Sequence, residues 1–278
     1  MKKSRVLMLM SAIAMLSSCL TACGISSFAS ENVKEDTVKL ENINQLTANL
    51  SSTDLRVKFG DENKLHYRVY ESLVPEINQK NGRLDIESPK NSGIHMHNDS
   101  KDNYIEITLN KNQLDTIDID ASSGDILFDS IDMGGKIKTS SGDIDLMNIE
   151  NGKDINIEVS SGDLDFRNCN FTTVNKISSS GDTHFEKVNA DKFTLESTSG
   201  ETKIKDSDIC DMEIKSTSGD IEMNLNGKQN DCNFELSVTS GSITVGGGSY
   251  KDNCTINNNA DKTIKCNATS GEIEINFN

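Results

Sequence analysis

A short motif of two small hydroxyl residues and a glycine occurs eight times between Ser122 and Gly271. It starts as Ser-Ser-Gly-Asp at Ser122–Asp125 and ends as Thr-Ser-Gly-Glu at Thr269–Glu272. Successive glycines are 18, 20, 19, 19, 19, 22 and 30 residues apart. A nearly constant period of this length is typical of stacked repeats, in which each repeat contacts its neighbours. The eight glycines are Gly124, Gly142, Gly162, Gly181, Gly200, Gly219, Gly241 and Gly271.

Apolar residues alternate with polar residues on both sides of these glycines. Around Gly162, Ile155 and Ile157 lie seven and five positions before it, and Leu164 and Phe166 lie two and four positions after it. Successive side chains of a strand point to opposite faces. Odd offsets before the glycine and even offsets after it can therefore face one interior only if the chain turns at the glycine. Glycine permits a positive φ or a tight bend at low cost, which predicts a strand–corner–strand unit.

The predicted fold is all-β, a single-stranded parallel β-solenoid with coils of about 19 residues. One such coil cannot bury its own inner face, whereas stacked coils pair above and below and enclose a continuous core. Residues 38–115 contain further alternating segments and are expected to form the first, less regular coils. Residues 116–278 are expected to form the regular repeats. An antiparallel sandwich is the alternative, but it does not require corners at one period.

One coil departs from the pattern. Lys176 stands where the register expects an apolar residue, and Val174 and Ile177 flank it. We therefore expect a β-bulge in this segment. Thr183 and Thr202 occupy inward positions that other coils fill with isoleucine or leucine.

The first 22 residues are typical of a secretory signal peptide. Three basic residues precede the apolar run Val6–Leu16, which is too short for a membrane span. Leu20–Cys23 resembles the lipobox of bacterial lipoproteins, which implies cleavage before Cys23 and a diacylglycerol on its sulfur. Residues 23–37 are expected to form a flexible tether. These features predict an extracytoplasmic protein that is anchored to a bacterial cell membrane through Cys23. An ordinary signal peptide is the alternative.

The charge of the chain restricts its partners. The formal net charge is −16, and without the three basic residues of the signal segment 25 Lys and Arg face 44 Asp and Glu, a net charge of −19. Such a surface repels nucleic acid and anionic lipid headgroups. It favours cationic peptides and basic proteins, and a solvated acidic face is the alternative interpretation.

Several segments together resemble a known family. Tyr104–Leu109, then Leu114–Ile119 and Ser122–Ile126, resemble the β-strand-repeat family of putative adhesins called domain of unknown function 4097. The resemblance covers the chain from about Asn42 onward and implies a parallel β-solenoid with a surface role. It supplies no catalytic residues. The family often has a Leu-Pro pair where this chain has Leu109-Asn110, a departure at the boundary of the first coil.

An acidic residue directly follows seven of the eight corner glycines. In a solenoid these residues would form an outward column with neighbours about 5 Å apart, where like charges repel unless they are screened or bridged. Calcium is one candidate bridge, but the dense Asp and Gly pattern of calcium-binding rolls is missing. We therefore predict no metal and no cofactor. The acids are Asp125, Asp143, Asp163, Asp182, Glu201, Asp220 and Glu272.

The cysteines suggest possible disulfides. Cys210 and Cys232 each lie nine residues before a corner glycine, so they are expected to stack in adjacent coils within reach of a disulfide. Cys254 and Cys266 flank the polar insertion of the longest interval and could close it. Cys169 falls at a position where other coils place Ile or Val, which predicts a buried thiol. The alternative is that all five are reduced.

The sequence offers little for catalysis. His95 and His97 alternate on a presumed strand, without a third metal ligand nearby. Some β-solenoids are polysaccharide lyases or hydrolases, but those require long loops and aromatic sugar platforms, and Trp is absent here. We predict a non-enzymatic protein that binds or scaffolds at the cell surface, like an adhesin. The alternatives are an envelope-stress or antimicrobial-peptide sensor and, from another class, a polysaccharide-active enzyme.

The last residues, Glu272–Asn278, form an alternating segment with no polar cap after it. An open strand edge can pair with another chain. We therefore expect this end to contact a partner or a second copy, end to end.

Overall fold

The computed structural model describes residues 32–89 and 103–278. The description below concerns the compact unit of residues Val33–Asn278. The signal segment, Cys23, His95 and His97 lie outside the described residues. The tether was expected to reach residue 37, but strand β1 begins at Val33, so the folded unit starts earlier.

Nearly all regular structure in the described residues is β-strand, and the all-β prediction is confirmed. Within residues 32–89 and 103–278, two 3₁₀ turns interrupt the strands, η1 (Glu71–Leu73) and η3 (Gln229–Asp231). The N-terminal section holds β1 (Val33–Lys39), β2 (Gln45–Leu50), β3 (Asp54–Phe59), β4 (Lys64–Tyr70), β5 (Glu76–Lys80), β6 (Arg83–Glu87) and β7 (Tyr104–Leu109). The middle holds β8 (Thr116–Ser123), β9 (Ile126–Asp129), β10 (Gly135–Ser141), β11 (Ile144–Gly152), β12 (Ile155–Ser161), β13 (Leu164–Ser180), β14 (Thr183–Ser199), β15 (Thr202–Ser218) and β16 (Ile221–Leu225). The C-terminal section holds β17 (Cys232–Ser240), β18 (Ile243–Val245), β19 (Gly248–Tyr250), β20 (Asn253–Ile256), β21 (Lys262–Ser270) and β22 (Ile273–Phe277).

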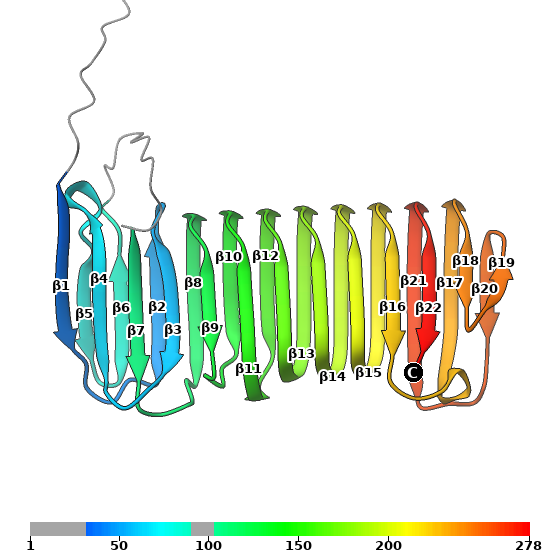
Figure 1. Ribbon diagram of the computed structural model, residues 1–278, viewed down its shortest axis with the longest axis horizontal. Coiled ribbons are helices and arrows are strands. Elements are labelled where there is room, and N and C mark those ends of the chain that lie inside the picture. Colours follow the sequence, from blue (N-terminus) through cyan, green and yellow to red (C-terminus); the bar gives the residue numbers. More distant parts are fainter. Residues whose placement is uncertain (1–31, 90–102) are drawn as a thin grey trace, which may run out of the picture. The chain divides into compact units, whose positions relative to one another are not determined.

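The strands form two layers that meet at the corner glycines (Figure 1). The pre-glycine layer consists of β6, β2, β8, β10, β12, the second halves of β13, β14 and β15, then β21 and β17. The post-glycine layer consists of β7, β3, β9, β11, the first halves of β13, β14 and β15, then β16, β22 and β18. Neighbouring strands within each layer are parallel. Leu164, Thr183, Thr202 and Ile221 lie side by side in four successive strands.

The alternating apolar residues of both layers enclose one continuous core. Their side chains form a single cluster that runs from Leu40 to Ile275. Inside it, the rings of Phe166 and Phe185 stack with centroids 4.8 Å apart. Burial of these rows is the main force that holds the coils together, because no single coil closes on itself.

The expected bulge at Lys176 is wrong. Lys176 stays in register with the inward residues of the neighbouring strands and is 1% exposed, whereas Ile177 points outward and is 56% exposed. The interval between corner glycines is 19 residues here and in the next two coils, so no residue is spare for a bulge. The Lys176 ammonium instead donates to the Oγ1 of Thr183 (2.7 Å) and to the carbonyl of Asp182 (3.2 Å).

The order of strands along the stack differs from the order along the chain at the C-terminal end. Strands β21 and β22 lie between β15/β16 on one side and β17/β18 on the other (Figure 1). Strand β22 therefore has a partner on both sides, and the prediction that the C-terminal strand leaves an open edge is wrong. The polar insertion of the longest interval supplies β19 and β20, which add antiparallel to β18 and β17 and turn the chain back inward.

The N-terminal end is arranged in the same way. Strands β2 and β3 lie between β8/β9 and the later pair β6/β7. Three antiparallel strands then cover the outside, because β5 pairs with β6, β4 with β7, and β1 with β4. Both ends of the stack are thus finished by antiparallel strands, a common way to cover the edges of a sheet.

The predicted disulfides are wrong, because one strand separates the members of each pair. Strand β21 lies between the strands that carry Cys210 and Cys232. Leu236 has Cys254 on one side and Cys266 on the other. Strands two places apart are separated by about 9.6 Å, beyond the Cα separation that a disulfide allows. All five cysteines of the described residues are free thiols.

Cys169 is buried, as predicted. Its thiol donates to the carbonyl of Leu146 (3.2 Å). Burial raises the pKa of this thiol to about 11. A thiol of this kind is inert at neutral pH and serves as a core residue.

Candidate functional site

The eight corner glycines form one column at the junction of the two layers. A Cβ added at Gly181, where φ is +111°, would lie 2.0 Å from the carbonyl oxygen of Gly162. The backbones of successive corners therefore approach too closely for any side chain, in addition to the positive φ. The column has the order Gly124, Gly142, Gly162, Gly181, Gly200, Gly219, Gly271 and Gly241, each with a positive φ.

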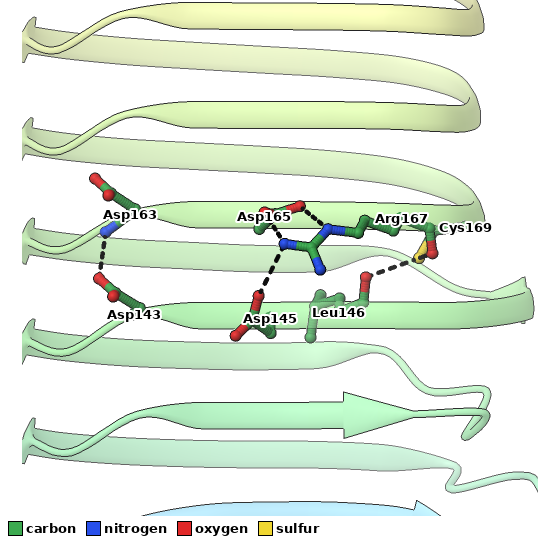
Figure 2. A network of polar contacts seen from close by, with 7 residues as sticks. All are labelled: Asp143, Asp145, Leu146, Asp163, Asp165, Arg167 and Cys169. Carbon is green, nitrogen blue, oxygen red and sulfur yellow. Dashed lines mark hydrogen bonds and ion pairs between the residues drawn. The ribbon is translucent and has the colours of Figure 1, made fainter.

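The acids that follow these glycines form a second column, the carboxylate column. In Figure 2 the backbone N–H of Asp163 donates to the Oδ1 of Asp143 (2.8 Å). Asp143 in turn donates its N–H to Asp125 (3.0 Å). The same bond recurs from Asp125 to Asp54 (3.1 Å), Asp182 to Asp163 (2.7 Å), Glu201 to Asp182 (2.7 Å) and Glu272 to Asp220 (2.8 Å).

These hydrogen bonds act against the repulsion that the sequence predicts between neighbouring carboxylates. In each pair one carboxylate accepts the backbone N–H of the adjacent corner, and hydrogen bonds to an ionised acceptor are stronger than neutral ones. These bonds offset part of the repulsion between neighbouring carboxylates of the column. Most of its members remain exposed, so it presents a line of negative charge to solvent.

A further group of charges lies beside the column on the outer face of β11 and β13 (Figure 2). The Arg167 guanidinium contacts both carboxylate oxygens of Asp165, with an Nε–Oδ1 distance of 2.9 Å, and lies 3.9 Å from Asp145. Partial burial, and then the neighbouring charges of Asp165, Asp143 and Asp125, raise the pKa of Asp145. One arginine thus faces several carboxylates, and the local potential stays negative.

The chain matches the family model described as Toastrack DUF4097 over residues 43–276. The chain belongs to this family. Among solved structures, a putative adhesin from Bacteroides fragilis is 12% identical and has a TM-score of 0.51, with 88% of this chain and 98% of that chain covered.

Two further solved structures resemble this Toastrack chain more distantly. A putative adhesin from Parabacteroides merdae is 12% identical, with a TM-score of 0.48 and coverage of 88% of this chain and 97% of that one. A putative lipid binding protein from Parabacteroides distasonis is 12% identical, with a TM-score of 0.41 and coverage of 90% and 98%. No protein of curated function matches the chain. At these identities the structural likeness concerns the fold.

The described part of this Toastrack chain contains no group of three or more His, Cys, Asp or Glu side chains that could hold a metal ion. His66 and His184 are both half-buried, and the Nδ1 of His66 lies 3.0 Å from the Oγ1 of Thr37. Within residues 32–89 and 103–278, no helix has the length and apolar character needed to cross a membrane.

Sequence reasoning missed a second corner column, on the far side of the post-glycine layer. Asn148, Asn168, Lys187 and Asp206 all have φ between +49° and +56°. Asn168 donates its amide to the Oδ1 of Asn148 (3.3 Å). Asparagine and aspartate adopt the left-handed region more readily than other non-glycine residues. In the sequence, Asn148 and Asn168, which are 20 residues apart, indicated this column. Lys187 at the next position of the repeat obscured the pattern.

Proposed function

We propose that this chain is a non-enzymatic binding protein whose single-stranded parallel β-solenoid is held at the outer surface of a bacterial membrane through lipidated Cys23. Its structural relatives are called adhesins or lipid binding proteins, which fits a binding role. The observation that carries the proposal is the set of in-register outward rows. Stacked coils bring the side chains of one repeat position into a straight line, which is how repeat proteins present extended contact surfaces.

The anchoring part of the proposal can be tested in cells of a bacterial host that expresses the full chain. A clickable fatty-acid analogue should label the protein, and the label should be lost in Cys23→Ser. The matched control is Cys19→Ser, which changes another cysteine of the signal segment. Retention of label in Cys23→Ser, or release of the labelled protein into the medium, would reject the anchor.

The carboxylate column supports a second candidate, the recognition of cationic peptides at the envelope. Its negative charges lie at the spacing of adjacent strands, about 4.8 Å, and a basic peptide could neutralise several of them at once. Such binding must weaken steeply with salt, since exposed charges are screened within about 10 Å at 0.1 M ionic strength. Binding that ignores salt would instead favour an adhesin-like contact with an uncharged ligand.

The test for the second candidate uses isosteric variants. Asp143→Asn with Asp163→Asn keeps the side-chain oxygens that accept the backbone bonds and removes two charges from the column. Affinity for a lysine-rich peptide, measured by calorimetry at low salt, should fall. The matched control is Asp118→Asn with Asp120→Asn on the outer face of β8. An equal loss in both double variants would mean that only net charge matters, and the column would have no special role.

A further inference from the structure

Strands β21 and β22 form a coil that is inserted between two coils that precede it in the chain (Figure 1). We call residues 262–278 the inserted coil, and the space between β15/β16 and β17/β18 the slot. Strand β21 pairs with β15 and β17, and β22 pairs with β16 and β18. The inserted coil also fills part of the core, because its inward side chains are buried. These are Ile264, Cys266, Ala268, Ile273 and Ile275.

The charges of the inserted coil complement the walls of the slot. Lys265 lies between Glu213 of β15 and Glu235 of β17, and its Nζ is 3.0 Å from the Oε2 of Glu235. Lys262 pairs with the carboxylate of Asp208 on the β15 side. Glu213 and Glu235 both stand six residues before a corner glycine, so they would face each other if β17 lay directly beside β15. Like charges in that position are destabilising. The acidic walls therefore favour a basic strand between them over direct contact.

Polar contacts join the inserted coil to both walls. Asn267 accepts a hydrogen bond from the hydroxyl of Ser237 in β17 (2.6 Å). The side-chain amide of Asn278 donates to Asp206 of β15 (2.7 Å), and its backbone N–H donates to the carbonyl of Leu225 in β16 (2.9 Å). Each of these contacts joins strands that are distant in the sequence. An identical coil from a second molecule would make all of them.

The connection into the slot is short and crosses a strand. Residues 257–261 lead from β20, on one side of β17, to β21 on the other side, a distance of about 9.6 Å. Asn259 in this connection has a φ of +53°. Asn258 donates to the carbonyl of Cys232 (2.7 Å), and Asn233 donates to the carbonyl of Ala260 (2.7 Å). Short hinge connections favour the exchange of the following segment between molecules.

We propose that two copies of this chain exchange their inserted coils, so that β21 and β22 of each copy fill the slot of the other. The contacts inside both slots stay the same, and only the course of residues 257–261 differs from the monomer. The balance between monomer and dimer then depends on the effective concentration of the coil at its own slot, which is on the order of millimolar for a short connection. The inference goes beyond the proposed binding role and requires neither the lipid anchor nor a ligand.

The experiment uses equal amounts of isotope-labelled and unlabelled full chain. The two are mixed in urea and refolded at chain concentrations up to about 1 mM, and monomer and dimer are separated by size-exclusion chromatography with light scattering. A carbodiimide then couples Lys265 to Glu235 through their ion pair. In the dimer fraction, mass spectrometry should find this cross-link between labelled and unlabelled peptides. In the monomer fraction, both peptides of the cross-link should carry the same label.

Two charge variants test whether the slot selects the coil. Lys265→Glu repels both walls of its own slot, and Glu235→Lys gives a slot with one wall that repels its own coil. A mixture should contain several times more dimer than either variant alone, because the exchange restores opposite charges at modest gain per exposed pair. The matched control is a mixture of Lys136→Glu and Glu158→Lys, which form an ion pair (2.8 Å) between β10 and β12 outside the slot. That mixture should contain no more dimer than its components.

Three results would overturn the proposal. The first is a dimer whose Lys265–Glu235 cross-links all lie within one label, which would mean that the copies associate without exchange. The second is the absence of dimer after refolding of both the parent and the mixed charge variants at about 1 mM. The third is an equal amount of dimer in the mixture and in each variant alone.

Discussion

The buried side chain of Lys176 allows a quantitative test of how much stability the core loses by burying a charge. Burial lowers the pKa of Lys176 from 10.5 to about 8, and the carboxylates of Asp163 and Asp182 partly oppose this effect. A lowering of that size corresponds to about 3 kcal/mol of lost stability when the amine is protonated in both states. We predict that Lys176→Met stabilises the protein at neutral pH. The gain should be about 2 kcal/mol, because the hydroxyl of Thr183 loses its partner at a cost of about 1 kcal/mol.

The dependence on pH distinguishes this explanation from a simple packing effect. Because the folded-state pKa is below the unfolded one, the penalty is complete below about pH 8 and disappears as the pH rises to 10.5. The difference in unfolding free energy between Lys176→Met and the parent should therefore shrink across this window. Taking the difference between the two proteins removes the contribution of every other titrating group.

The assay is urea unfolding at a series of pH values from about 7 to 10.5, followed by circular dichroism. Lys138→Met, at an exposed lysine of strand β10 two strands away, is the control and should show neither the gain nor the pH dependence. The reasoning is refuted if Lys176→Met is less stable than the parent at pH 7. It is also refuted if the difference between the two proteins is the same at both ends of the pH range.

Three further predictions concern the columns and the thiols. Gly181→Ala should destabilise the protein by more than about 3 kcal/mol, because the new Cβ would clash with a backbone carbonyl. Gly247→Ala, which has open space around it, should cost about 1 kcal/mol. Equal losses of unfolding free energy in urea would contradict the close stacking of the corners. Asp163→Asn should change the unfolding free energy by no more than about 0.5 kcal/mol. Asp163→Ala should lower it by about 1–2 kcal/mol, because the N–H of Asp182 loses its acceptor. The opposite ranking would mean that repulsion dominates the column. Native alkylation followed by mass spectrometry should modify Cys210 first among the five described cysteines, because the other four are buried; a disulfide found between any two of them would contradict the strand order.

The sequence was a good guide to each coil. The period of the glycines located the corners, and the alternation around them identified the inward residues, including Thr183 and Thr202, which are both buried. The reason is local. A positive φ and a two-residue alternation leave their mark within a few positions of the chain, so a single repeat is enough to recognise them.

The sequence was a poor guide to which coils are neighbours. Nearly interchangeable coils can stack in more than one order, and spacing along the chain does not record the order. The placement of β21 between β15 and β17 depends on how well each strand edge of the whole fold pairs with the others. The disulfide and open-edge predictions failed for that one reason. Lys176 failed for a different reason, because the fixed positions of the two corner glycines outweighed the preference of one side chain for solvent.

The hydrogen bonds of the carboxylate column also lay beyond the sequence. An acid after each glycine was visible, but its meaning depended on where the side chain points. In the structure Asp143 and Asp163 accept backbone N–H groups from the adjacent corners, so the repeated acid is explained by the backbone before any ligand is considered. Most of these residues also expose their negative charge to solvent.

The two ends of the stack suggest why the chain doubles back. A coil that simply followed its predecessor would leave two parallel edges open at the end, each able to pair with another molecule. Here strands β21 and β22 lie inside the stack, between β15/β16 and β17/β18. The preceding strands β17 and β18 are at the end of the stack, where the short antiparallel strands β20 and β19 cover them. Strands β1, β4 and β5 do the same at the other end. With the edges covered, the outer faces of the layers and the carboxylate column at their junction are the extended surfaces that remain for recognition.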